Sequence, residues 1–76
     1  MTLTTMVFND HKKDGLVTKA GRAFVKDGTR VLTRTVYRDA YDNTCYVIIN
    51  GDAKVFHEYT HTFYNRYDDI TMGGYI

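Results

Sequence analysis

The sequence has no proline, no serine and a single cysteine among its 76 residues. Average usage would give about four prolines, and their absence leaves no proline-rich linker. The lack of serine removes the nucleophile of the common Ser-His-Asp triad. Because Cys45 is alone, this chain has no internal disulfide, which argues against a disulfide-stapled secreted scaffold and favours a reducing compartment such as the cytoplasm.

Long hydrophobic runs are also missing. The longest apolar run, residues 45–49, is far shorter than the roughly 18–20 residues that cross a bilayer, and residues 1–8 do not resemble a signal peptide. We therefore expect a soluble protein with no membrane partner. The length suits one domain, residues 1–76, with a thin stability margin, and a homodimer is one way for so small a domain to gain stability.

The net charge of +1 hides an uneven distribution. Residues 1–38 hold eight basic and three acidic side chains, whereas residues 39–76 hold two basic and six acidic ones. Such an asymmetry can mark a surface for an oppositely charged partner. In a domain this small the two halves can equally lie side by side and offset each other, so both interpretations stay open.

Two glycine turns indicate β-hairpins. Asp-Gly at 27–28 and Asn-Gly at 50–51 stand between runs of β-branched and aromatic residues, which is the strongest short-range hairpin signal. The polar segment 39–43 predicts a further reversal. The expected strands lie near residues 21–26, 30–38, 44–50 and 53–64, with a fifth strand at 2–8 and a charged loop at 9–15. The fold class is therefore mainly β: a small antiparallel meander or open barrel of four to five strands, with room for one short helix.

Two segments are harder to assign. Residues 16–26 also carry apolar side chains at helical spacing, although a strand is the favoured interpretation. Near the end of the chain, Gly73 and Gly74 are expected to break regular structure. The apolar Tyr75 and Ile76 are expected to dock on the sheet or on a neighbouring subunit.

Residues 57–61 match H-E-x-x-H, the zinc-binding signature of a large class of metalloproteases. On a helix, His57 and His61 would lie on one face about 6 Å apart and share a Zn²⁺ ion, with Glu58 as general base. On a strand they would stand about 13 Å apart, at 3.3 Å per residue, and could not share a metal. The motif therefore depends on the secondary structure of this segment.

The sequence of this segment is compatible with both structures. Apolar residues recur at helical spacing from Phe56 to Ile70, which would give an α+β fold with a helix at about 53–70. The segment, however, consists mainly of weak helix formers. Its residues also alternate with period two, as the side chains of a strand do. Metzincins have a glycine three residues after the second histidine and a further histidine ligand three residues beyond it, and these positions hold Tyr64 and Tyr67 here. We favour a strand, and with it no metal and no cofactor.

Arginine and tyrosine are concentrated around the second hairpin strand. Arginines spaced by four would share one face of a strand, and three tyrosines, Tyr37, Tyr41 and Tyr46, lie nearby in the sequence. This combination is typical of protein interfaces and of single-stranded nucleic-acid sites, but arginines on an edge strand can also simply guard it against pairing. The predicted partner-binding residues are Arg30, Arg34, Tyr37, Arg38 and Tyr41.

These features favour a non-enzymatic protein. The predicted function is a small binding module that acts by protein–protein interaction as an accessory inhibitor or regulator, for which a phage-encoded inhibitor of a host protein is one setting. The alternative is a single-stranded nucleic-acid-binding β domain, although the near-neutral charge counts against it. A zinc-dependent hydrolase built on His57, Glu58 and His61 is the third hypothesis. Cys45, within an apolar run, is expected to be a buried, unreactive thiol.

Overall fold

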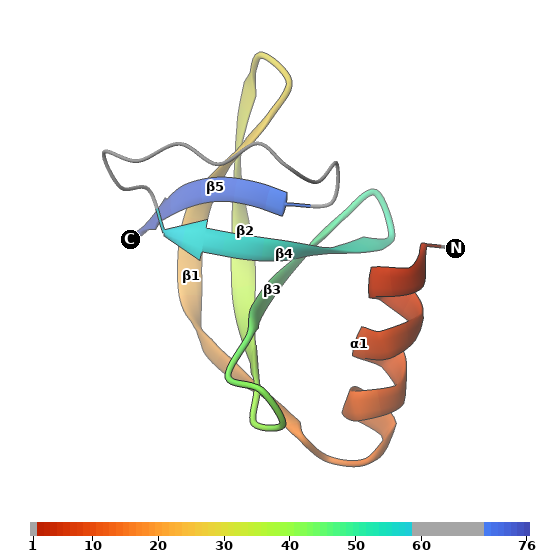
Figure 1. Ribbon diagram of the computed structural model, residues 1–76. Coiled ribbons are helices and arrows are strands. Elements are labelled where there is room, and N and C mark those ends of the chain that lie inside the picture. Colours follow the sequence, from red (N-terminus) through yellow and green to blue (C-terminus); the bar gives the residue numbers. More distant parts are fainter. Residues whose placement is uncertain (1, 59–69) are drawn as a thin grey trace.

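The computed structural model describes residues 2–58 and 70–76 (Figure 1). These residues form one helix and five strands: α1 (Leu3–Lys13), β1 (Val17–Asp27), β2 (Arg30–Asp39), β3 (Cys45–Ile49), β4 (Asp52–Glu58) and β5 (Ile70–Tyr75). The prediction of a mainly β fold with a short helix is confirmed. The strands expected near residues 21–26, 30–38 and 44–50 correspond to β1, β2 and β3.

The strands close into a barrel in the order β1-β2-β3-β4-β5, with β5 paired to β1. Neighbouring strands are antiparallel except for β4 and β5, which run parallel. The antiparallel meander of the first four strands is therefore confirmed. The barrel is closed and not open, because β5 joins β4 to β1 and so removes most of the free edge that an open sheet would have.

The two glycine turns form two-residue hairpin loops. Asn50 and Gly51 both have positive φ, 52° and 82°, which is the signature of a type I′ turn. In the first hairpin the strand register places the loop at Gly28 and Thr29, and only Gly28 has positive φ, 63°, which fits a type II′ turn. The Asp-Gly motif thus predicted this hairpin correctly but placed its central residues one position too early.

The N-terminal segment corrects the predicted fold. The predicted strand at 2–8 and the predicted loop at 9–15 are both wrong, because helix α1 spans most of the two segments. Threonine and valine are weak helix formers, which is why the composition indicates a strand. Packing overrides that preference here, since Thr5 and Phe8 are buried against the barrel.

Both ends of α1 are capped. The Thr2 hydroxyl accepts the Thr5 N–H at 3.1 Å and so satisfies one of the free donors of the first turn. At the other end, the Leu16 N–H donates to the His11 carbonyl at 3.0 Å, and Gly15 adopts the left-handed conformation with φ of 77°. This arrangement is a Schellman motif, which ends the helix and directs the chain into β1.

Strand β5 is a second correction, because the sequence predicts that Gly73 and Gly74 break regular structure. Both glycines lie inside the strand, and Gly73 pairs with Val25 of β1 and with Glu58 of β4. A Cβ atom at Gly73 would clash with the carbonyl oxygen of Phe24. The glycine therefore allows β5 to approach β1 closely enough to close the barrel.

Two apolar clusters lie on opposite faces of the sheet. The barrel core fills the interior and consists of Ala23, Val25, Val36, Val47, Ile49 and Phe56, with Leu32 and Cys45 packed against it. The helix core lies between α1 and the outer face of the sheet and consists of Phe8, Tyr46 and Ala53, with Val17, Tyr37, Ile48 and Val55 beside it. Consecutive residues of β3 alternate between the two cores, as side chains on a strand must.

The first part of the H-E-x-x-H segment is extended. β4 covers residues 52–58, which excludes the alternative helix over 53–58. The rest of the expected strand at 53–64, including His61, lies outside the described residues. The ambiguous segment 16–26 is confirmed as a strand from Val17 onward.

Candidate functional site

The three predicted arginines lie on β2, and every residue of β2 pairs with a residue of β1. Strand alternation places Arg30, Arg34 and Arg38 on the same face as Val36, which is fully buried. Arg30, at the exposed end of the hairpin, forms an ion pair with Asp27 at 2.8 Å. The arginines therefore form a row whose two ends are exposed and whose middle member is half-buried.

The two predicted tyrosines do not join this row. Tyr37 lies on the opposite face of β2, where its ring packs edge-to-face on Phe8 with 5.7 Å between centroids. Tyr41 follows β2 in the turn and is 74% exposed, and its ring lies 5.0 Å from that of His11. The five predicted residues are thus divided between the arginine row, the helix core and the turn after β2.

A different surface brings exposed apolar and basic side chains together. The upper part of the β1–β2 hairpin projects beyond the rest of the barrel (Figure 1). We define the outer arm face by outward-pointing residues of the hairpin tip and of the adjoining part of the hairpin, where β5 pairs with residues 23–25 of β1. These residues are Arg22, Phe24, Lys26, Val31 and Thr33. Phe24 is 49% exposed and Val31 is 62% exposed. Helix α1 packs on the outer face only at the other end of the hairpin, where Val17 and Tyr37 join the helix core.

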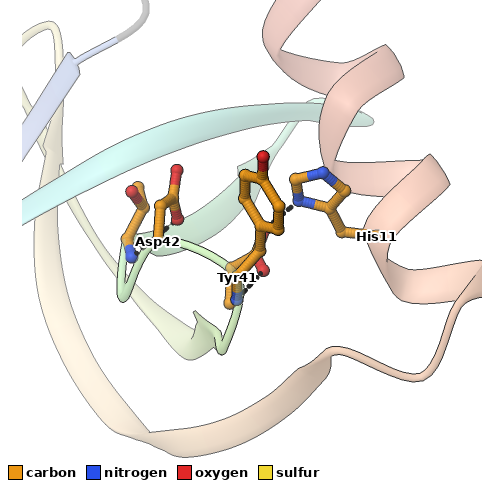
Figure 2. Close-up of polar contacts among 5 residues, drawn as sticks. His11, Tyr41 and Asp42 are labelled. Carbon is orange, nitrogen blue, oxygen red and sulfur yellow. Dashed lines mark hydrogen bonds and ion pairs between the residues drawn. The ribbon is translucent and has the colours of Figure 1, made fainter.

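A polar cluster joins α1 to the turn after β2 (Figure 2). His11 Nδ1 pairs with Asp39 Oδ2. Asp39 is completely buried, and its other carboxylate oxygen accepts the Tyr41 N–H at 2.9 Å. Its backbone is fixed as well, because its N–H donates to the Thr44 carbonyl and its carbonyl accepts the Asn43 N–H, both at 2.8 Å. The buried carboxylate is therefore hydrogen-bonded at both oxygens, as burial of a charge requires.

Two pKa values in this cluster are shifted. The hydrogen bond with Asp39 raises the pKa of His11 above its usual 6.5, and the negative charges of Asp39, Asp42 and Asp14 raise it further. The pKa of Asp42 is lowered, because its carboxylate accepts hydrogen bonds from the side chain and backbone of Thr44. Asp39 and Asp42 each accept the N–H two residues on, so the predicted reversal at 39–43 is confirmed as two Asx turns.

The His11–Asp39 pair is suited to anchoring the helix. Such a pair activates a nucleophile only when a hydroxyl or thiol is within hydrogen-bond reach of the other ring nitrogen. Within the described residues, the His11 side chain hydrogen-bonds to Asp39 alone, and its neighbouring ring is that of Tyr41. No sequence pattern indicates this pair, because the two residues are 28 positions apart and His11 lies in a segment predicted as a loop.

The end of the chain docks on the sheet, as the sequence predicts. The Tyr75 ring packs edge-to-face on Phe56 with 5.4 Å between centroids, and the Ile76 N–H donates to the Arg22 carbonyl at 3.0 Å. The Tyr75 hydroxyl lies 4.0 Å from the sulfur of Cys45. Burial raises the pKa of Tyr75, and the neighbouring Cys45 adds to the shift. Cys45 itself is half-buried against the barrel core and not fully buried as expected.

The described part of the zinc motif does not form a metal site. His57 and Glu58 are consecutive residues of β4, and both are exposed. Their side chains therefore point to opposite faces of the strand and cannot converge on one ion. Over residues 2–58 and 70–76, no group of three or more His, Cys, Asp and Glu side chains is arranged to hold a metal.

Comparisons with known proteins give no match to a family model, to a curated protein or to a solved structure. In the part of the chain that the structure describes, no helix combines the length and the apolar character of a membrane-spanning segment. Among the described residues, the outer arm face places exposed apolar side chains beside basic ones.

Proposed function

We propose that this protein is a small non-enzymatic binding module that contacts a partner protein through the outer arm face of the β1–β2 hairpin. One observation carries the proposal. Phe24 and Val31 lie on neighbouring strands of the projecting hairpin and are both exposed, and no described element covers them. Two large apolar side chains that are exposed on the same face of neighbouring strands are typical of a surface that a partner buries.

The chemistry of this face limits the partner. Arg22 and Lys26 flank Phe24 on the same face of β1. An apolar centre with a basic rim complements a protein surface that has a hydrophobic pocket surrounded by carboxylates. A module of this size acts by occluding that surface, as an accessory inhibitor or regulator does. A cytoplasmic setting, such as inhibition of a host protein by a phage, suits a chain whose one cysteine is unpaired.

Capture of the partner from a lysate of the source organism tests the proposal. Phe24→Ala removes the exposed ring of the arm, and Leu3→Ala removes a side chain that is 75% exposed on the distant helix. We expect the native chain and Leu3→Ala to capture the same protein, and Phe24→Ala to lose it while its circular dichroism spectrum stays unchanged. Capture of no protein, or equal capture by Phe24→Ala, would contradict the proposal.

A single-stranded nucleic acid is the second candidate, because the same face is basic and carries an exposed ring. Arg22 and Lys26 can contact phosphates while Phe24 stacks on a base. Fluorescence anisotropy with a labelled oligothymidine distinguishes this candidate. Binding to nucleic acid weakens steeply as salt rises, since each neutralised phosphate releases counterions. Absence of binding at low salt would remove the nucleic acid and leave the protein partner.

A further inference from the structure

Among the described residues, one edge of β2 has no partner strand over most of its length. β2 pairs with β1 at every residue from Arg30 to Asp39. On its other edge it pairs with β3 only at Tyr37 and Arg38. Figure 1 shows the reason, since β3 turns away towards β4 while the hairpin continues past the barrel. Among the described residues, no strand lies beside this edge of β2 over residues 30–36.

The hairpin geometry identifies the backbone groups on this edge. In an antiparallel pair, alternate residues direct their N–H and C=O groups to one neighbour or to the other. The residues that flank a two-residue loop bond to each other, so Val31, Thr33 and Thr35 point away from β1. The Asp39 N–H follows the same alternation and donates across this edge to Thr44 at 2.8 Å. We call the backbone groups of these three residues, Val31, Thr33 and Thr35, the free edge.

The hydrogen-bonding groups of the free edge match those of an extended strand. The three residues offer donors and acceptors at every second position, about 6.8 Å apart, and an added strand matches that spacing. The acceptor at Thr33 already has a substitute partner, because Nη1 of Arg34 donates to its carbonyl at 2.8 Å. The side chain of Arg34 thus occupies the place that a backbone donor of a neighbouring strand would take.

The positive charges on β2 indicate which kind of strand would pair with the free edge. Arg30 and Arg34 lie on one face of β2, and an antiparallel strand places its own side chains directly opposite them. A second copy of β2 has only arginines and aliphatic residues on that face, so it brings no carboxylate to this edge. A strand with carboxylates four residues apart pairs with both guanidinium groups. The ion pair of Arg30 with Asp27 is exposed to solvent, and such pairs are weak enough to exchange.

We propose that the free edge of β2 binds an extended acidic segment of the partner protein as an added antiparallel strand, with Arg30 and Arg34 pairing with two of its carboxylates. On docking, Arg34 exchanges the Thr33 carbonyl for a carboxylate, because a guanidinium pairs more strongly with a charged acceptor than with a neutral carbonyl. The inference rests on the proposed function and gives it a recognition mode. Val31 and Thr33 belong to both surfaces, so one partner can extend the sheet and cover the outer arm face.

A designed peptide tests strand addition on the full chain. The capped peptide TETVTET places its glutamates opposite Arg30 and Arg34 and its valine opposite Leu32. Three matched peptides carry lysine for glutamate, an N-methyl group on the third residue, whose N–H faces β2, or an N-methyl group on the fourth residue, whose N–H faces away. Binding is followed by the backbone amide NMR shifts of the protein.

We expect the glutamate peptide to shift the amides of Val31, Thr33 and Thr35. The lysine peptide and the peptide N-methylated at its third residue should bind about tenfold more weakly or not at all, while N-methylation at the fourth residue leaves the affinity unchanged. No shift at millimolar peptide, or equal effects of the two N-methyl groups, would overturn the inference. A dimer that forms without peptide and that the peptide does not dissociate would also overturn it.

The variant Arg34→Ala distinguishes two roles of this side chain, which are pairing with a carboxylate of the added strand and protecting the edge against strand addition. If Arg34 pairs with a carboxylate, the variant binds the glutamate peptide about tenfold more weakly. The control is Lys19→Ala, an exposed basic residue of β1 opposite Tyr37 and outside both surfaces, and it binds the peptide normally. If Arg34 only protects the edge, its removal strengthens peptide binding or causes self-association, and the inference is wrong. A partner capture that requires Phe24 but not Arg34 keeps the proposed function and rejects strand addition, whereas a capture that is independent of Phe24 rejects the proposed function itself.

Discussion

Helix α1 covers one end of the outer sheet surface, and no described element covers the other end. Under α1, the ring of Phe8 is 2% exposed and packs on Tyr37 and Tyr46, with centroids 5.7 and 5.2 Å away. At the hairpin end, Phe24 is 49% exposed and has no described helix above it. The same chain therefore buries one phenylalanine on this side of the sheet and leaves another in water.

The covered end is held by three contacts from one face of the helix. Thr5 Oγ1 accepts the Ala53 N–H at 3.0 Å, Phe8 packs in the helix core, and His11 pairs with Asp39. The three helix residues are spaced by three, which places them in one stripe. Their contacts reach β2, β3 and β4, so α1 stabilises the part of the barrel where those strands meet. In our account, a partner protein supplies the corresponding cover at the other end.

The largest expected effect comes from the same substitution at the two ends. Phe8→Ala removes a buried ring and should lower the free energy of unfolding by about 3–5 kcal/mol. Phe24→Ala removes an exposed ring and should change it by less than about 0.5 kcal/mol. Urea unfolding of both variants measures the difference, and similar losses for the two would show that the hairpin end is covered as well.

Gly73→Ala probes how the base of the hairpin is held in the barrel. The added Cβ would clash with the Phe24 carbonyl and lie 3.0 Å from the Phe56 ring, so we expect a loss of about 1–3 kcal/mol. The control is Gly74→Ala, because nothing lies within 4 Å of the added Cβ at that position. Thermal unfolding should show a clearly lower Tm for Gly73→Ala alone, and equal Tm values would contradict this account of barrel closure.

Thr5→Val tests the hydrogen bond that ties α1 to β4. The change preserves the shape of the side chain but leaves the buried Ala53 N–H without its acceptor, which should cost about 1–3 kcal/mol. At the uncovered end, Thr35→Val removes a hydroxyl that forms no such bond and should stay within about 0.5 kcal/mol. Denaturant midpoints compare the two, and a harmless Thr5→Val would mean that the helix does not depend on this contact.

The smallest expected effect is the pH dependence of the His11 anchor. The pKa of His11 is raised in the folded protein above 6.5, so its contribution is fully present below about pH 6.5 and disappears as pH rises through the folded value. The difference in unfolding free energy between the native chain and His11→Ala should therefore shrink with rising pH. A difference that stays constant or grows between about pH 6 and 9 would contradict the role of Asp39 as its partner.

The sequence predicted the parts of the fold that depend on local chemistry. Asn50-Gly51 and Gly28 determine two hairpins through their own backbone conformations, and the strands beside them follow from β-branched residues. α1 was mistaken for a strand because threonine and valine outweighed the cap at Thr2 and the left-handed Gly15. The cap at Thr2 and Gly15 are both present in the sequence and mark the two ends of the helix. Packing of Phe8 supplies the stability that the low helix propensity of threonine and valine does not provide.

Features that depend on distant residues could not be predicted in this way. β5 pairs in parallel with β4, and the need for Gly73 appears only when the Phe24 carbonyl is placed against it. The His11–Asp39 pair likewise requires knowing that the helix lies beside the end of β2. The alternation of β2 places the three arginines on one face and Tyr37 on the other, but only the structure shows that α1 covers the face of Tyr37.

Residue-resolved amide hydrogen exchange of the native chain tests the central claim, which is that β2 has an open edge beyond its pairing with β3. Exchange should alternate along the strand, with Val31, Thr33 and Thr35 exchanging fast and the amides of Leu32 and Arg34, which bond to β1, exchanging slowly. Uniform slow exchange from residue 31 to 36 would contradict the account, because it would mean that this edge is already paired.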